Sequence, residues 1–186
     1  MTEPHLGGAY PQGDANTIMP DVWGYLLVKY DLKSVLDVGC GFGDAMEWFA
    51  KHGLCNVTGI DGWDEAVKAC RIPGAAILHD FTKGPPPIGS PFDLVWSAEF
   101  LEHVEARYIP NIMAAMRLGR YACVTHAEPG QNGHHHVNCQ TTDYWIKQFA
   151  EYGFEHVEEE TKLFRATDRW RATWGRRTLT MFKRVR

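Results

Sequence analysis

The sequence lacks any long apolar run: no stretch approaches the roughly 20 residues that a membrane-spanning helix needs. It also lacks, at its start, the basic region followed by an apolar one that is typical of a secretory leader. Hydrophobic residues make up 45% of the chain and charged residues 23%, which is ordinary for a globular protein. We therefore expect a cytoplasmic protein without a membrane span.

Cysteine is also sparse. The chain has five cysteines, scattered along its length and without a Cys-x-x-Cys pair. An odd, scattered set predicts free thiols in a reducing compartment. This excludes a disulfide-stapled scaffold and argues against a zinc site built on cysteine.

The chain has no large excess of charge, with a formal net charge of −4. The distribution is uneven, because residues 161–186 hold nine Lys or Arg and only one acid. A basic tail could meet an anionic partner, but the acidic run at 155–160 directly before it offers an internal counterpart. We do not expect a nucleic-acid partner, and the sequence does not fix the oligomeric state.

No internal repeat is present, and 186 residues favour one domain. Residues 1–19 are rich in Gly, Pro and polar residues without periodicity, so we expect an N-terminal arm or cofactor lid that could use Tyr10, Asp14 and Thr17. Residues 20–186 are expected to form the single folded domain.

Within that domain, short apolar runs alternate with helical patterns. This alternation predicts an α/β fold: a Rossmann-like, seven-stranded, mainly parallel sheet with helices on both faces and the last strand antiparallel. The segment 161–177 has no assignment. The expected strands are 35–38, 56–61, 75–78, 92–96, 121–126, 153–160 and 178–183, and the expected helices are 20–27, 44–52, 64–71, 105–118 and 141–152.

The most informative stretch runs from Ser34 to Ala50. A buried strand leads into Gly39, Gly41 and Gly43, and a helix follows. Glycine lets the backbone approach a ligand closely, and the helix start offers free N–H groups. The spacing is G-x-G-x-G, and Asp44 stands where a dinucleotide fingerprint has its last glycine. A carboxylate there suits a ligand with an amine or sulfonium cation, so a nicotinamide oxidoreductase is not expected.

The run V-L-D-V-G-C-G-F-G resembles the first motif of class I S-adenosylmethionine-dependent methyltransferases, in which this loop wraps the methionine part of the cofactor. The run F-D-L-V-W-S-A-E-F-L-E-H-V at 92–104 is a second match to the family. Its Glu-His-Val ending is common among small-molecule O-methylating members. The Asn/Asp-Pro-Pro-Tyr motif of enzymes that methylate exocyclic or amide nitrogen is absent, which counts against adenine or glutamine as acceptor.

Asp61 follows the second expected strand, 22 residues after Gly39. An acid at this place accepts hydrogen bonds from ribose hydroxyls, although a lone Asp at a strand end can also be a helix cap. The resemblance implies that Asp80 and Phe81 contact the adenine. Trp63 could pack on the adenine or in the core. The residues expected to bind S-adenosylmethionine are Asp37, Gly39, Cys40, Gly41, Gly43, Asp61, Gly62, Trp63, Asp80, Phe81, Ser97 and Glu99.

Methyl transfer to a hydroxyl gains from a general base, and histidine suits that task near neutral pH. The candidates are His135 and His136, in a polar loop after the fifth expected strand, and His103; His126 and His134 were also considered. Glu99, Glu102 and Glu128 could hold a cation, but no spacing singles them out. The sequence therefore leads us to expect no metal.

The G-H-H-H-V-N loop at 133–138, followed by Tyr144 and Trp145, looks like that of small methyltransferases associated with glycan and surface-polysaccharide synthesis, including viral ones. That resemblance implies a small-molecule or glycan acceptor. His135, His136 and Asn138 could bind and deprotonate a polyol. Trp145, Trp170 and Trp174 could stack on a sugar ring or lie in the core.

The leading hypothesis is thus an S-adenosylmethionine-dependent O-methyltransferase (EC 2.1.1.-) that acts on a hydroxyl of a sugar, a glycan or a similar small molecule. A phenol or a carboxylate is the rival acceptor. A regulatory module that binds the cofactor without turnover, and an RNA binder that uses the basic tail, are the alternatives from other classes.

Overall fold

The computed structural model describes residues 3–7, 13–167 and 175–186. Tyr10, Trp170 and Trp174, which the sequence analysis singled out, lie outside these residues. All five cysteines are free thiols, as expected. Within the described part of the chain, no helix combines the length and the apolarity needed to cross a bilayer.

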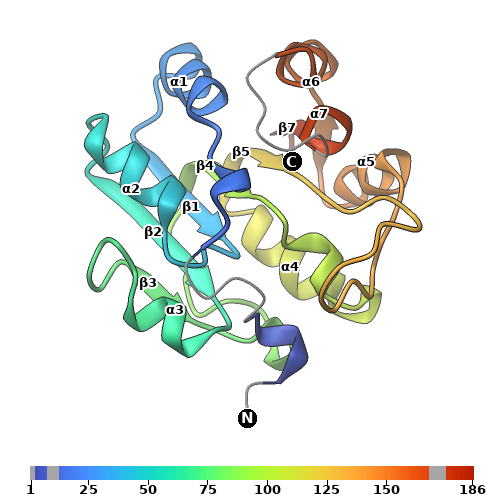
Figure 1. Cartoon of the computed structure of the whole chain (residues 1–186). Helices are drawn as coiled ribbons and strands as arrows, with labels where there is room; N and C mark the ends of the chain where they lie inside the picture. Colours follow the sequence, from blue (N-terminus) through green and yellow to red (C-terminus); the bar gives the residue numbers. More distant parts are fainter. Residues whose placement is uncertain (1–2, 8–12, 168–174) are drawn as a thin grey trace.

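Seven strands form one sheet in the order β3-β2-β1-β4-β5-β7-β6 (Figure 1). β7 runs antiparallel to β5 and β6, and the other pairs are parallel. This confirms the expected α/β fold with its antiparallel last strand. The strands are β1 (Ser34–Val38), β2 (Asn56–Asp61), β3 (Ala76–Leu78), β4 (Phe92–Ser97), β5 (Gly119–Val124), β6 (Phe154–His156) and β7 (Thr180–Arg184).

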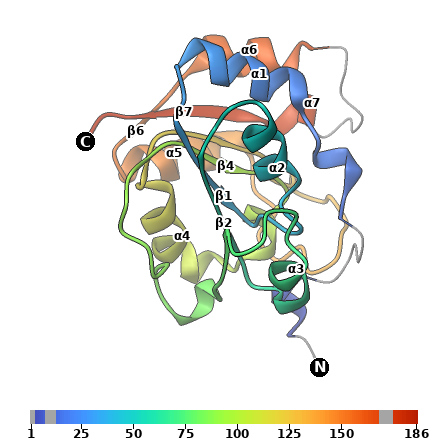
Figure 2. The same ribbon diagram turned by 90° about the vertical axis from the view of Figure 1, so that its left-hand side faces the viewer.

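Successive side chains of the central strands enter opposite cores, which is why these strands read as continuous apolar runs. In β1, Val35 belongs to the core that holds buried residues of α1 (Pro20–Lys29), α2 (Asp44–Lys51) and α6 (Glu158–Arg165). Its neighbour Leu36 belongs to the core that holds buried residues of α4 (Ile109–Met116) and α5 (Thr142–Glu151). Helices therefore cover both faces, with α1 and α6 on one side of β7 and α4 on the other (Figure 2).

The sequence prediction was wrong between Val157 and Glu160. The expected strand 153–160 ends at His156, and α6 begins at Glu158. Acidic residues in a first helical turn complement the positive end of the helix dipole, and Glu158 pairs with Lys162 one turn later at 2.6 Å. Burial of Phe164 at 2% exposure then fixes the helix on the sheet. The last two strands do pair antiparallel, but helices of the intervening chain, α6 and α7 (Gly175–Thr178), replace a tight hairpin.

The expected helix 105–118 is also shorter than predicted. A 3₁₀ turn over Ala106–Tyr108 precedes α4, and Pro110 lies in the first turn of that helix. Proline has no N–H to donate, so it is tolerated where a helix begins and not one turn further in.

β1, β2 and β4 are parallel neighbours, so their carboxyl ends meet at one edge of the sheet. The chain proceeds outward from β1 to β2 and β3 and then returns to β4 on the other side of β1. Ligands of open α/β sheets bind at such a reversal of strand order. The loop after β1, the loop after β2 and the segment after β4 all begin at this place.

Candidate active site

A cavity of about 400 Å³ lies at this edge of the sheet. That volume is within the range of small-molecule sites. Three strand-end loops line it, together with two N-terminal segments and a loop near residue 133. The lining comes from residues 5–7, 13–17 except 15, 37, 39–42, 44–45, 61–63, 96, 98–100, 103, 131–134 and 136.

The glycine loop forms one wall of this cavity. Gly39 and Gly41 have φ values of 75° and 51°, in the left-handed region that favours glycine. A Cβ on Gly39 would lie 2.6 Å from the Phe100 ring, whereas a Cβ on Gly41 would have no heavy atom within 4 Å outside its chain neighbours. Gly39 therefore serves close packing, and Gly41 leaves backbone open to a ligand.

Asp61 joins this loop to the end of β2. Its carboxylate accepts a hydrogen bond of 2.7 Å from the Gly41 N–H and one of 2.8 Å from the Trp63 N–H. Burial raises the pKa of Asp61, while those N–H groups oppose the rise. Each carboxylate oxygen bonded in this way keeps a lone pair that can accept from a ligand hydroxyl.

Two further lining residues are buried, Asp37 near the end of β1 and Cys40 in the loop after it. Asp37 is 4% exposed, and burial followed by the charge of Asp61 raises its pKa to about 8. Cys40 is 7% exposed, and burial raises the pKa of its thiol well above the ordinary value. Both line the cavity as expected, Cys40 as a small apolar group and not as a reactive thiolate.

Asp80 and Phe81 line a smaller cavity of about 30 Å³, which shares Gly62 and Phe100 with the main one. Asp80 accepts a hydrogen bond of 2.8 Å from the Thr82 N–H and caps a 3₁₀ turn. Its carboxylate also lies 3.3 Å from His5 Nε2. The N-terminal arm therefore lies against the part of the site expected to hold the adenine.

Two expected cofactor residues, Ser97 and Gly43, line neither cavity. The Ser97 hydroxyl is fully buried and donates to the Val38 carbonyl at 2.8 Å, which fastens β4 to β1. Gly43 has a φ of 82° at the start of α2, and a Cβ there would lie 2.9 Å from Cys70 Sγ. Ser97 and Gly43 therefore stabilise the backbone on either side of the glycine loop.

Glu99 lines the main cavity directly after β4. Its φ of 53° is uncommon for a residue with a side chain. The Glu99 N–H donates to Thr125 Oγ1 at 2.8 Å, which holds this conformation. Burial raises the pKa of Glu99 to about 7.

The histidines divide between two surroundings. His103 and His136 line the main cavity, with ring centres 5.1 Å apart, whereas His135 lines the smaller cavity. His126 is fully buried and bonds to Thr142 Oγ1 at 3.1 Å, which places it behind the site. Burial lowers the pKa of His103 to about 4, so its imidazole is neutral at pH 7.

Backbone hydrogen bonds hold the histidine loop in place. The N–H groups of Val137 and Asn138 donate to the Glu102 carbonyl at 2.9 and 3.0 Å. The Asn138 side chain is 2% exposed and donates to the Val104 carbonyl at 3.1 Å. Asn138 therefore secures the loop and is not available to a polyol, in contrast to the expectation from sequence.

Packing decides two possibilities that the sequence left open. Trp145 is fully buried in the core with α4 and α5, the second of its two expected places, so it cannot stack on a sugar. Glu128 pairs with Arg177 at 2.7 Å and lines neither cavity.

Sequence analysis missed the contribution of His5, Phe100 and Gly133. His5 lies far from the motifs in sequence, and only its contact with Asp80 reveals it. Phe100 covers Gly39, a contact that spacing does not indicate. The sequence shows Gly133 as the start of the histidine loop, but the position of the His136 ring beside it appears only in the folded structure.

Comparison with known proteins agrees with this geometry. Residues 36–118 match the family described as Methyltransferase domain. No curated protein sequence matches the chain.

Several solved structures share the fold. A TehB-like S-adenosylmethionine-dependent methyltransferase from Corynebacterium glutamicum is 17% identical with a TM-score of 0.68, covering 92% of this chain and 90% of that one. Magnesium protoporphyrin IX methyltransferase from Synechocystis PCC 6803, with bound S-adenosylhomocysteine, is 17% identical with a TM-score of 0.65, covering 89% and 81%. The CcbJ methyltransferase from Streptomyces caelestis is 13% identical with a TM-score of 0.62, covering 96% and 95%.

Residues 36–118 match a methyltransferase domain, and the strand order together with the glycine loop is that of the class I S-adenosylmethionine-dependent methyltransferases. The cofactor of such methyltransferases is S-adenosylmethionine. The residues present fit this cofactor, because Gly41 leaves open backbone and Asp61 keeps free lone pairs beside it.

Proposed function

We propose that this protein transfers a methyl group to a hydroxyl of a sugar, a glycan or a similar polar small molecule. One observation carries the proposal: a single cavity is lined both by the glycine loop with Asp61 and by His103 and His136. A bound acceptor would therefore lie between the methyl donor and two imidazoles.

The lining opposite the glycine loop is polar. Gln131, Asn132 and His134 contribute to it, and amide and imidazole groups can donate to and accept from hydroxyls. The resemblance of the G-H-H-H-V-N loop to glycan-associated methyltransferases supports the same acceptor class.

In the proposed reaction, the acceptor oxygen forms a bond to the methyl carbon while the carbon–sulfur bond breaks and its electron pair stays on sulfur. The hydroxyl proton moves to an imidazole nitrogen, that of His136 or His103. His135 is the remaining candidate of the sequence analysis, and it lies on the smaller cavity. Proton removal by a positioned base typically contributes about 10²- to 10⁴-fold.

The N-terminal arm has a proposed part as well. His5, Leu6 and Gly7 line the main cavity beside Gly62 and Trp63, so we propose that the arm covers bound cofactor.

Transfer of a labelled methyl group from S-adenosylmethionine to a panel of acceptors tests the function. The panel holds free and glycan-linked deoxysugars, nucleotide sugars, phenols, carboxylic acids and RNA. We expect label in a sugar, with turnover lowered at least about 100-fold in His136→Ala or His103→Ala and unchanged binding of S-adenosylhomocysteine. The control is His52→Ala, which changes an exposed histidine directly after the end of α2.

Label only in phenols, carboxylic acids or RNA would contradict the hydroxylated acceptor. Cofactor binding without label in any acceptor would instead favour a regulatory module. Full activity of both histidine variants would move the base to another residue.

A further inference from the structure

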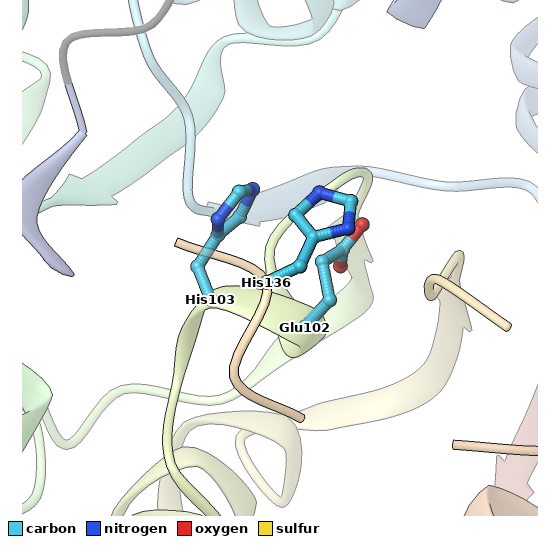
Figure 3. A group of neighbouring side chains, drawn as sticks. All are labelled: Glu102, His103 and His136. Atoms are coloured by element: carbon cyan, nitrogen blue, oxygen red, sulfur yellow. The ribbon is translucent and has the colours of Figure 1, made fainter. Parts of the chain in front are cut away.

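We propose that Glu102, His103 and His136 bind a divalent transition-metal ion at the inner end of the cavity. One ligand atom from each of the three side chains lies within 4.8 Å of the others. Figure 3 shows the carboxylate and the two imidazoles side by side, with Glu102 and His103 on one short turn and His136 on the facing loop. The sequence alone led us to expect no metal, because nothing in it brings residue 136 beside residue 102.

Glu102 supplies the strongest observation. It has no exposed surface, and neither of its carboxylate oxygens has a hydrogen-bond donor among the described residues. A buried carboxylate without donors is costly, and a buried polar group without a partner calls for an explanation such as an ion. Burial, and after it the charge of the neighbouring Glu99, raises the pKa of Glu102 well above its ordinary value, and a protonated Glu102 can donate to the Glu99 carboxylate. A bound cation would take the place of that proton and keep the Glu102 carboxylate ionised.

His136 is oriented as a metal ligand. Its Nδ1 lies 3.1 Å from the Gln131 carbonyl oxygen. Because a carbonyl can only accept, Nδ1 carries the proton, and Nε2 presents a bare lone pair. Metal-binding histidines are usually fixed by such a bond from the other ring nitrogen.

Gly133 lies against the ring of His136. A Cβ on Gly133 would lie 2.1 Å from Nε2, 2.3 Å from Cε1 and 2.5 Å from Cδ2 of His136, which places it over the face of the ring. A side chain at position 133 would therefore displace the imidazole. This gives the glycine that begins the G-H-H-H-V-N loop a specific role in the proposed site.

The donor set indicates the class of ion. Two imidazoles and one carboxylate suit Zn²⁺, Fe²⁺ or Co²⁺, whereas Mg²⁺ prefers oxygen ligands and water. Sites with three protein ligands leave positions open for a small molecule. Here His103 and His136 also line the main cavity, so an open position would face the acceptor.

The role of the ion, unlike its binding, rests on the proposed function. An ion at this place would lower the pKa of a hydroxyl that occupies an open position. With both imidazoles bound to the ion, neither could take the hydroxyl proton, which would leave to solvent; in the metal-bound protein this step replaces the imidazole base of the proposed function. The methyl carbon would form its bond to the same oxygen as the carbon–sulfur bond breaks.

Binding of Co²⁺ to chain freed of metal by chelation tests the site directly, because Co²⁺ bound by imidazole and carboxylate has a visible absorption band. The measurement uses the chain without an added polyhistidine tag. We expect one Co²⁺ per chain, displaced by Zn²⁺ and not by equimolar Mg²⁺. Glu102→Gln keeps the shape of the side chain and removes its charge, and we expect it to weaken binding at least about 100-fold, beyond the roughly 10- to 100-fold effect of outer-shell changes.

His136→Ala and Gly133→Ala should weaken binding as well, the second without removing any ligand. His52→Ala is the control, since it removes an exposed imidazole that lines neither cavity. Thermal unfolding of every metal-free variant shows whether each one folds. Equal Co²⁺ affinity of the folded Glu102→Gln variant and the original chain would overturn the site, as would the absence of any saturable Co²⁺ binding.

Failure of this proposal is distinguishable from failure of the proposed function. Methyl transfer to a sugar that persists after chelation, with no Co²⁺ binding, would remove the metal and leave the acceptor class standing. Co²⁺ binding with the expected variant pattern, but no sugar methylation, would establish the ion and contradict the acceptor.

Discussion

The Asp61 carboxylate accepts the Gly41 N–H at 2.7 Å, and this bond ties the loop after β1 to the end of β2. The same carboxylate accepts the Trp63 N–H, so both strand ends are fixed around one acid. A residue that holds two loops in this way shapes the cavity before any ligand arrives, and it also presents acceptors to that ligand. The predictions below separate such shaping effects from direct contacts.

Replacing Asp61 by alanine should weaken binding of S-adenosylhomocysteine on the order of 100-fold. Hydrogen bonds to a charged group contribute about 1.5–3 kcal/mol, and roughly 1.4 kcal/mol corresponds to a tenfold change in affinity. Titration calorimetry measures the effect. Asp64→Ala, at the first residue of α3 (Asp64–Lys68), removes a nearby carboxylate that does not line either cavity and should bind normally. Unchanged affinity of Asp61→Ala would refute the ribose role.

Gly39→Ala and Gly41→Ala should have opposite profiles. A Cβ on Gly39 meets Phe100 at 2.6 Å in a left-handed backbone, and strain with overpacking should cost about 3 kcal/mol of stability. Gly41→Ala carries only the backbone cost of roughly 1 kcal/mol, but its methyl group would protrude toward the ligand. Urea unfolding and cofactor titration together measure the pair. Equal losses of stability would show that Phe100 moves aside.

The fold followed from sequence because its signals are local. Runs such as Val35–Val38, which is apolar except for Asp37, are typical of a strand buried on both faces, and Gly39 and Gly41 mark the loop that follows. The strand expected at 153–160 is present as β6, and the prediction was wrong only from Val157 onward, because Glu158 begins a helix whose Phe164 packs against Tyr25 of α1. Alternation over a few residues does not reveal such a tertiary contact.

The residues of the site also differ in whether the sequence alone reveals them. Asp61 could be found from its distance to the glycine loop, since parallel strand ends meet at one edge. The surroundings of Glu102 could not be predicted in this way. A buried carboxylate whose oxygens accept no hydrogen bond is recognised only in the folded structure. The neighbours of His136 and His135 differ although the two residues are adjacent, because a φ of 49° at His135 turns the chain between them.

Replacing His5 by alanine should speed the release of S-adenosylhomocysteine and weaken its binding several-fold. The His5–Asp80 pair at 3.3 Å holds the arm against Gly62 and Phe81, and a pair of this kind contributes up to about 1 kcal/mol. Stopped-flow displacement measures the release rate. Lys83→Ala, on the 3₁₀ turn that follows Asp80, is the control. Identical release rates would show that the arm does not retain the cofactor.

Stability should fall as the pH drops from 7 to 5, partly through His126. Burial, with a smaller effect from Arg165, lowers the pKa of His126 to about 4, although the Ala127 carbonyl and Glu128 favour the charged form. The unfolded chain gains this proton below pH 6.5 and the folded chain does not, so the free energy of unfolding decreases by about 2 kcal/mol at pH 5. In His126→Gln that contribution is absent, and its curve of stability against pH should be flatter by this amount in urea unfolding. His52→Gln makes the same change at an exposed position and should leave the curve parallel to that of the original chain. A His126→Gln curve that also stayed parallel would mean that His126 takes up its proton equally in both states, and the buried, neutral histidine would have to be abandoned.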